Sequence, residues 1–275
     1  MNAAGSALAE LFPDADFRLH LTLRRGEPAE FFRVPDGAAP ILAERARWID
    51  DAPSRYTALT AEGAPLLREF ATLAASWGAP WSATGEDLGR SFDCDVLLLS
   101  ADAAGEFRLR GGALCFPTGW ALEEKLGHTM DEIHGVVPGL NPALGATIRQ
   151  FLARLKPGVA YHRDNWGLAA SDELNLHPVR AIAAPEPPVA LDRLWLRVEH
   201  QALIALPQTR GIVFGIRIAL HRLDEVAHSV AAPGLRRALA TLSPELACYK
   251  RIERVRDQVV SLLGTGSPSG GKSPS

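Results

Sequence analysis

The feature that most constrains this fold is a pair of long segments joined by a short turn. LDRLWLRVEHQALIAL, residues 191–206, alternates apolar and polar side chains for most of its length, and GIVFGIRIAL, residues 211–220, follows shortly after it. Alternation with a period of two is typical of a β-strand whose two faces meet different surroundings. Because so short a turn returns the chain along the strand that it has just left, the two segments predict an antiparallel hairpin.

Other segments are expected to extend this sheet. DVLLLSA and FRLRGGALCF are separated by a short turn and predict a second hairpin. Helical spacing and capping residues predict helices before, between and after the strands. The sequence has neither the strand–helix rhythm nor the glycine-rich phosphate loops of nucleotide-binding α/β folds. We therefore expect an α+β fold with a curved antiparallel sheet and helices on one side. The further strands are expected at residues 17–24, 95–101, 107–116 and 159–170, and the helices at 38–50, 62–77, 118–125, 129–134, 141–155, 221–230, 233–242 and 244–263.

The length and the order of these elements predict a single domain. A chain of 275 residues is long enough to bury most of its apolar surface without disulfides or a structural metal. We expect the domain to span residues 1–263, with an N-terminal extension over about 1–90, a core over about 91–220 and C-terminal helices over about 221–263. The Gly/Ser/Pro-rich end, residues 264–275, is expected to be a disordered tail because it cannot bury enough apolar surface.

Composition argues against several classes of partner. The formal net charge is −3, so the chain has no basic field to attract nucleic acid. The three cysteines lie far apart, which argues against a disulfide framework, a thiolate zinc site or iron–sulfur ligation. No stretch approaches the roughly 20 apolar residues of a membrane span, and the N-terminus lacks the basic start of a signal peptide. We therefore expect a cytoplasmic protein that binds neither nucleic acid nor membrane.

The stretch FPTGWALEEKLGHTMDEIHGVVPGLN, residues 116–141, contains the first candidate for a cofactor ligand. Thr129 and Glu132 have the spacing of a capping box, which starts a short helix, and Gly135 ends that helix directly after His134. An imidazole fixed at such a corner beside two valines suits a haem axial ligand, since haem iron is often held by one proximal histidine. The alternative, an ordinary surface or hydrogen-bonded histidine, stays open on this reasoning.

A second candidate group, Arg197, Glu199 and Gln201, lies on one face of the strand predicted over residues 191–206. Long polar side chains flanked by buried apolar residues are costly unless they are paired or face a cavity. They form either a solvated sheet face or the polar floor of a ligand pocket, with Arg217 of the next strand opposite. In a pocket, an arginine would neutralise a haem propionate or another anion. The glutamate would fix a cationic amine or relay protons.

A third candidate group, Arg163, Asn165 and Trp166, falls in the strand predicted over residues 159–170. In a haem pocket, Arg163 would bind a propionate and Trp166 would pack against the porphyrin edge. The alternative is an edge strand with one buried tryptophan. The residues alone do not decide between the two interpretations.

These motifs together resemble the haem-dependent oxidative N-demethylase alpha-subunit family. FPTGWALEEKLG and IHGVVPG are followed by NW, by LWLRVEHQALIALP and by a VFGIR strand, in the family's order and at similar spacings, over roughly residues 12–243. The resemblance implies a PAS-like domain whose curved antiparallel sheet and short helices clasp haem b. The family's ligand histidine maps onto His134. Its arginine–glutamate pair maps onto Arg197 and Glu199, and the arginine of the next strand maps onto Arg217.

The resemblance also implies an activity and partners. The characterised type of member oxidises dimethylamine to methylamine and formaldehyde with O2, so we expect a haem monooxygenase that acts on a small secondary amine. Electrons would come from NADPH through partner reductase subunits that carry FMN and a 2Fe–2S cluster. A folate-binding partner that carries tetrahydrofolate would accept the one-carbon product.

This chain departs from the family pattern at several positions. Val136 stands where a proline is expected after the ligand histidine, and His200 stands inside the expected glutamate–arginine–glutamine run. Ile218 and Ala219 stand where threonine and tyrosine are expected, which removes a pair of hydroxyl groups. More of the matching positions therefore support haem binding than support amine turnover. It leaves as alternatives a haem-based PAS sensor of gas or redox state, a haem-binding protein without turnover, and a scaffold that has lost haem.

Overall fold

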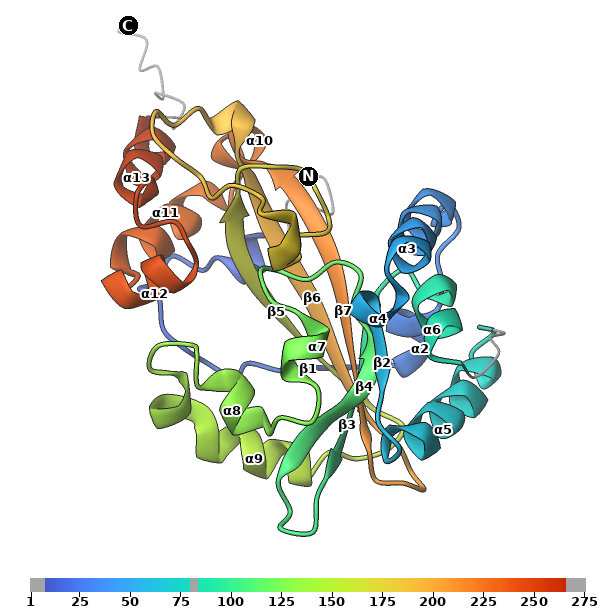
Figure 1. Cartoon of the computed structure of the whole chain (residues 1–275). Coiled ribbons are helices and arrows are strands. Elements are labelled where there is room, and N and C mark those ends of the chain that lie inside the picture. The colour runs from blue at the N-terminus through green and yellow to red at the C-terminus, as the bar shows by residue number, and fades with distance from the viewer. Residues whose placement is uncertain (1–7, 80–83, 266–275) are drawn as a thin grey trace, which may run out of the picture.

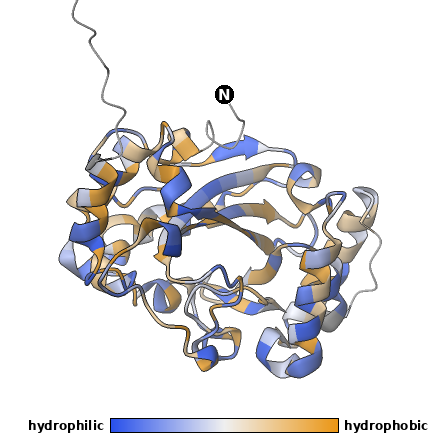
Figure 2. Ribbon diagram, turned by 90° about the horizontal axis from the view of Figure 1, so that it is seen from above, coloured by the Kyte–Doolittle hydropathy of each residue, from blue (hydrophilic) through white to orange (hydrophobic). Residues whose placement is uncertain are grey.

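An antiparallel sheet of seven strands forms the centre of the part of the chain that the computed structural model describes, residues 8–79 and 84–265. The strands lie in the order β1-β5-β6-β7-β3-β4-β2, and helices flank the sheet (Figure 1). The flanking helices carry both hydrophobic and hydrophilic residues (Figure 2), as amphipathic elements do. The predicted α+β fold is therefore confirmed. The strands are β1 (Arg24–Gly26), β2 (Thr57–Leu59), β3 (Asp95–Ala101), β4 (Phe107–Ala113), β5 (Ala160–Ala169), β6 (Trp195–Ala205) and β7 (Ile212–Arg222).

The two longest strands are the hairpin that the alternating segments predict. β6 and β7 each contain 11 residues and pair antiparallel along their full length. Side-chain contacts hold the turn between them in place. The carboxylate of Glu69 accepts hydrogen bonds from the backbone N–H groups of Gln208 at 2.6 Å and Thr209 at 2.8 Å. The turn is therefore anchored to helix α5 (Gly63–Ser76), which helps to hold the register of the hairpin.

The register of β6 and β7 defines two faces, because directly paired residues of an antiparallel sheet lie on the same face. We call the face that carries Glu199 and its partner Ile218 the inner face. We call the face that carries His200 and its partner Arg217 the outer face. Each candidate residue on the sheet belongs to one face or the other, so only residues of the same face can share a pocket.

The inner face is covered by the short helices that connect β4 to β5. Leu122 and Leu152 from these helices are buried in one cluster with Leu203 and Ile216 of the sheet. Helix α8, by contrast, contributes no buried residue, so it is the least tightly packed part of this cover. The covering elements are α7 (Leu122–Lys125), α8 (Met130–His134), the π-helical turn η1 (Asn141–Gly145) and α9 (Ala146–Ala153).

The outer face is covered by two separate groups of helices. The C-terminal helices pack against Leu196 and Val198, and N-terminal helices pack against Ala202 and Ile204. The expectation of helices on one side of the sheet is therefore wrong, because both faces carry apolar side chains that need a cover. The C-terminal group is α10 (Leu223–Ala227), α11 (Ala232–Thr241), α12 (Pro244–Tyr249) and α13 (Arg256–Thr265), and the N-terminal group is α2 (Pro28–Phe32), α5 and α6 (Gly85–Ser91). Helices α3 (Ala39–Asp51) and α4 (Pro53–Tyr56) pack in a separate cluster with Cys115 and Phe116.

Several predicted boundaries differ from the observed ones. The strand expected over residues 17–24 is reduced to β1, and the helix expected over 244–263 is divided into α12 and α13. Arg251, between those two helices, has a φ of 58°, a conformation that ends a helix. The expected disordered tail begins inside α13, which runs to Thr265, and its remainder lies outside the described residues.

In the described part of the chain, every helix is either too short or too polar to cross a bilayer.

Candidate functional site

The position of His134 is set by the capping box that the sequence predicts. The Thr129 hydroxyl accepts a hydrogen bond from the Glu132 N–H at 3.1 Å, and the Glu132 carboxylate accepts one from the Thr129 N–H at 2.7 Å. These reciprocal bonds start α8, and the helix ends at His134. The predicted capping box and the placement of His134 at the end of a short helix are confirmed.

The imidazole of His134 has an unusual environment. Its Nδ1 atom is buried and has no hydrogen-bond partner among the described residues. Burial lowers the pKa of His134, and the nearby positive charge of Arg163 lowers it further. The ring is therefore neutral at pH 7 and offers a lone pair, which is the form in which histidine binds a metal.

Arg163 supplies the second unusual feature of this region. It lies on the inner face, paired with Gln201 of β6. Within the described ranges, its guanidinium forms neither a hydrogen bond nor a salt bridge. Burial lowers its pKa, and the negative charges of Glu199 and Asp164 oppose that effect. A partly buried cation without a close partner is costly, so this position favours an anionic group.

Glu199 is held beside Arg163 by two amide side chains. One carboxylate oxygen, Oε2, accepts hydrogen bonds from Asn165 Nδ2 at 3.2 Å and from Gln201 Nε2 at 2.9 Å. The other oxygen, Oε1, receives no hydrogen bond from any residue that the structure describes. The Oε1 atom of Gln201 is buried and is likewise unpaired within those residues. This part of the inner face therefore presents polar atoms whose bonding capacity the described chain does not use.

Arg197 lies on the same face but has a structural role. It is 1% exposed. Its Nε donates to the Thr118 hydroxyl at 2.9 Å, and its Nη2 donates to the carbonyls of Phe116 and Leu174 at 2.8 Å each. These bonds tie two loops to the sheet. Arg197 therefore has little donor capacity left for a ligand, and we correct its predicted direct role to one of positioning.

The structure separates Arg217 from Arg197 and Glu199. Arg217 pairs with His200 on the outer face, where its guanidinium binds the carboxylate of Asp93 through two hydrogen bonds of 2.7 Å. The expectation that Arg217 lies opposite Glu199 in one pocket is therefore wrong, because the register places their side chains on different faces of the sheet.

Trp166 also lies away from His134 and Arg163. Its ring is 7% exposed and packs edge-on against Phe12, with the ring centroids 5.2 Å apart, in the cluster under the C-terminal helices. Because consecutive residues of a strand point to opposite faces, Trp166 lies on the outer face. The alternative of a buried tryptophan describes it better than contact with a porphyrin.

Two residues near the site were missed in the sequence analysis, Lys250 and Tyr249. The Lys250 ammonium donates to the Trp166 carbonyl at 2.5 Å, at the edge of β5. Burial, opposed by Glu199 and assisted by Arg163, lowers the pKa of Lys250 to about 8. Burial and Glu199 raise the pKa of Tyr249. No local motif marks these residues, because they reach the site from the end of α12, far along the chain.

Among the described residues, His134 belongs neither to a cluster of protein ligands for a metal nor to the lining of either of two cavities. In residues 8–79 and 84–265, no group of three or more His, Cys, Asp or Glu side chains is placed to hold a metal ion. Two cavities, of about 280 and 320 Å³, are lined by other residues than His134. A metal at His134 would therefore have to arrive with its own additional ligands, as the iron of a haem does.

A comparison with known families places these features in context. The family model described as "Haem-dependent oxidative N-demethylase, alpha subunit-like" matches residues 82–260, which is well over half of the chain. The matched region contains the strands from β3 to β7, the helices that cover the inner face and all of the candidate residues discussed above.

Proposed function

We infer the function from one premise, that this chain belongs to the haem-dependent oxidative N-demethylase alpha-subunit-like family. We propose that it binds haem b on the inner face and takes part in the O2-dependent removal of a methyl group from a small secondary amine such as dimethylamine. The balanced reaction converts the amine, O2, two electrons and two protons into the demethylated amine, formaldehyde and water. The observation that carries the proposal is that the buried Nδ1 of His134 and the nearby guanidinium of Arg163 both lack a hydrogen-bond partner among the residues that the structure describes.

The residues present fit a haem. A neutral imidazole at the end of α8 supplies the nitrogen ligand that haem iron requires, and the pKa of His134 is lowered in the direction that keeps it neutral. The guanidinium of Arg163 supplies a positive charge that can form an ion pair with a haem propionate. The apolar cluster of the inner face, to which the partly buried Met130 and Ile133 of α8 contribute, supplies a surface for the macrocycle. Because α8 has no buried residue, this cover is the easiest part of the face to lift.

When bound, the haem would supply the activation of O2 that amine oxidation needs. The chain's own residues would bind and orient the substrate. Asn165 and Gln201 fix one oxygen of the Glu199 carboxylate, so the other oxygen is directed toward a ligand. A protonated secondary amine carries two N–H donors, and a charge-assisted hydrogen bond to this oxygen would hold it in place. Arg197 would act indirectly, by holding the loops that carry Phe116 and Leu174 against the sheet.

The resemblance to a PAS-like domain belongs to the same proposal. The short helices between β4 and β5 lie across one face of an antiparallel sheet (Figure 1), which supports a PAS-like haem domain within a single domain over residues 1–263. We further propose a cytoplasmic protein that receives electrons from separate subunits carrying FMN and a 2Fe–2S cluster. A tetrahydrofolate-binding partner would accept the one-carbon product.

One observation favours a second candidate, a haem-binding sensor without turnover. Ile218 lies on the inner face, paired with Glu199 and packed against apolar neighbours, where the family resemblance leads one to expect a hydroxyl residue. A distal side without that hydroxyl group would bind a gas but would handle protons poorly.

A single-turnover experiment distinguishes the two functions. The haem-loaded protein is mixed with O2 and with a chemical reductant that supplies two electrons per haem, in the presence and absence of dimethylamine, and assayed for formaldehyde. The demethylase proposal predicts amine-dependent formaldehyde and its loss in Glu199→Gln, with the haem spectrum retained. An oxygen-dependent spectrum that the amine leaves unchanged, with no formaldehyde, would contradict the demethylase and favour the sensor.

A further inference from the structure

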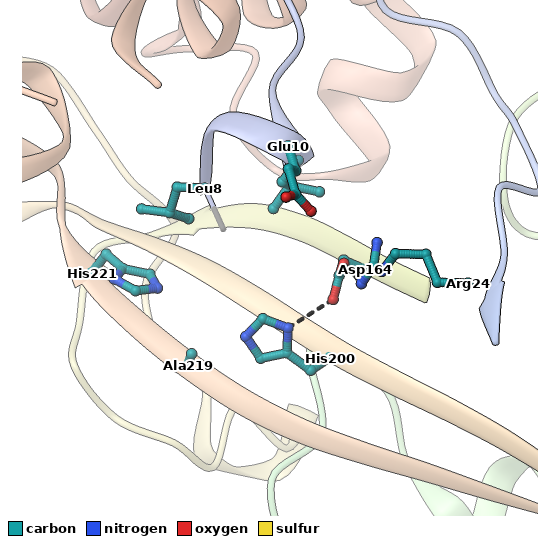
Figure 3. Close-up of a pocket in the computed structure, with 8 residues that line it drawn as sticks. Leu8, Glu10, Arg24, Asp164, His200, Ala219 and His221 are labelled. Carbon is teal, nitrogen blue, oxygen red and sulfur yellow. Dashed lines mark hydrogen bonds and ion pairs between the residues drawn. The ribbon is translucent and has the colours of Figure 1, made fainter. Parts of the chain in front are cut away.

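A cavity of about 280 Å³ lies on the outer face of the sheet (Figure 3). Its floor is formed by Asp164, His200 and Ala219 of three neighbouring strands, and its opposite wall includes Glu10 from the helical turn at residues 8–11. At roughly 30 Å³ per water molecule, it has room for a small organic molecule.

A hydrogen-bonded dyad dominates the polar side of this cavity. Asp164 Oδ2 accepts from Arg24 at 2.6 Å, and Asp164 Oδ1 lies 2.7 Å from His200 Nδ1. Burial would raise the pKa of Asp164, but the hydrogen bonds from His200 and Arg24 outweigh it and hold the pKa below its ordinary value. The ionised carboxylate selects the His200 tautomer with its proton on Nδ1. In the neutral imidazole, the Nε2 atom of His200 then presents a lone pair.

The remaining polar groups add acceptors and negative charge. His221 is a second imidazole in the wall, and burial, together with the neighbouring His200, lowers its pKa. Glu10 forms no hydrogen bond or ion pair with the described residues, and its carboxylate faces the same space (Figure 3). Arg24 and Asp164 form an ion pair, so their charges cancel. The carboxylate of Glu10 therefore gives the lining of the cavity a net negative charge.

The apolar part of the lining indicates the shape of the ligand. Leu8 and Leu11 border the cavity beside Glu10, and they offer contact to an alkyl group. Ala219 stands where the family resemblance leads one to expect a tyrosine, and a tyrosine side chain there would occupy the space. The small residue is therefore what keeps the cavity open.

We propose that this cavity binds a small organic cation that carries both N–H donors and a short alkyl chain. Its donors would bond to the Glu10 carboxylate and to His200 Nε2, and its alkyl chain would lie against Leu8 and Leu11. An anion of the same size would meet the carboxylate of Glu10 and be repelled. The proposal concerns the outer face, and it stands whether or not haem binds at His134.

The test is a calorimetric titration of the full-length, haem-free protein with butylammonium chloride at low salt. Sodium butyrate, of similar length and opposite charge, and tetraethylammonium, which lacks N–H donors, are the matched probes. The proposal predicts saturable one-to-one binding of butylammonium and weaker binding of both other probes. Butyrate or tetraethylammonium binding as tightly as butylammonium would overturn it, as would the absence of saturable butylammonium binding.

Variants locate the site. Glu10 is exposed, so Glu10→Gln should fold normally and weaken butylammonium binding by about tenfold or more, because it removes a charge-assisted hydrogen bond. Ala219→Tyr should abolish binding by filling the cavity, and if that variant fails to fold, Glu10→Gln alone decides. His134→Ala should bind as the unmodified protein does. Unchanged binding in Glu10→Gln, or binding lost only in His134→Ala, would overturn the proposal without touching the proposed haem function.

Discussion

The contrast between Arg197 and Arg163 gives the sharpest prediction about the sheet. Both arginines lie on the inner face, on neighbouring strands. Within the described part of the chain, Arg197 forms three hydrogen bonds shorter than 3.0 Å, whereas the Arg163 guanidinium forms none. Hydrogen bonds to a charged group contribute about 1.5–3 kcal/mol each. Burial lowers the pKa of Arg197 to about 10, so keeping the buried guanidinium charged costs on the order of 3 kcal/mol, which offsets part of the contribution of these hydrogen bonds. Replacing Arg197 with Met should therefore destabilise the fold by about 3 kcal/mol.

Replacing Arg163 with Met should instead stabilise the fold or leave its free energy of unfolding unchanged. This substitution removes a partly buried charge that has no close partner in the described residues, and it leaves no acceptor unsatisfied. Haem binding should nevertheless weaken, because a propionate would lose its positive partner.

The assay for both variants is urea unfolding at pH 7, followed by tryptophan fluorescence. With a slope of about 2–3 kcal/mol per molar urea, Arg197→Met should lower the midpoint by roughly 1 M, and Arg163→Met should leave it unchanged or raise it. Equal destabilisation by the two substitutions would refute the reasoning, because it would mean that the hydrogen bonds of Arg197 do not distinguish its contribution to stability from that of Arg163. A change in slope would instead indicate an altered denatured state.

Two further predictions concern buried charges. Arg45 and Asp95 are 0% and 1% exposed and 2.8 Å apart, so Arg45→Met should cost about 3–5 kcal/mol by leaving a buried carboxylate without its cation; a loss below about 1 kcal/mol in urea unfolding would contradict this. The pKa of Lys250 is about 8 in the folded protein and 10.5 ordinarily, so between these values the unfolded chain binds more protons and stability should rise with pH. The rise should amount to roughly 3 kcal/mol and be absent from Lys250→Met; parallel stability–pH curves for the two proteins would show that Lys250 is not responsible.

Local patterns predicted the elements of this fold well, because each depends on neighbouring residues. The alternation in β6 and β7 predicted their hairpin, and the spacing of Thr129 and Glu132 predicted the start of α8. The face on which Arg217 lies could not be predicted in the same way. It depends on the register across the turn, and a shift of one residue would move every side chain to the other face.

The roles of the site residues depend still more on distant parts of the chain. Arg197 was predicted to face a ligand because its strand is otherwise apolar, but its partners are carbonyls of two loops that are more than 20 residues away in the sequence. Lys250 reaches the edge of β5 from a C-terminal helix. Sequence patterns of short range carry no information on either contact. His134 was predictable because its constraint, a capping box followed by glycine, is local.

The most direct test of the account is the coordination of haem by His134. Apo-protein is titrated with haemin, and the Soret band is recorded for the unmodified chain, for His134→Ala and for His128→Ala, a histidine of the same stretch that is exposed. The account predicts a saturable Soret band that is lost or shifted in His134→Ala, restored toward its original position by added imidazole, and unchanged in His128→Ala. An identical Soret band in His134→Ala and in the unmodified protein would contradict the assignment of this imidazole as the iron ligand.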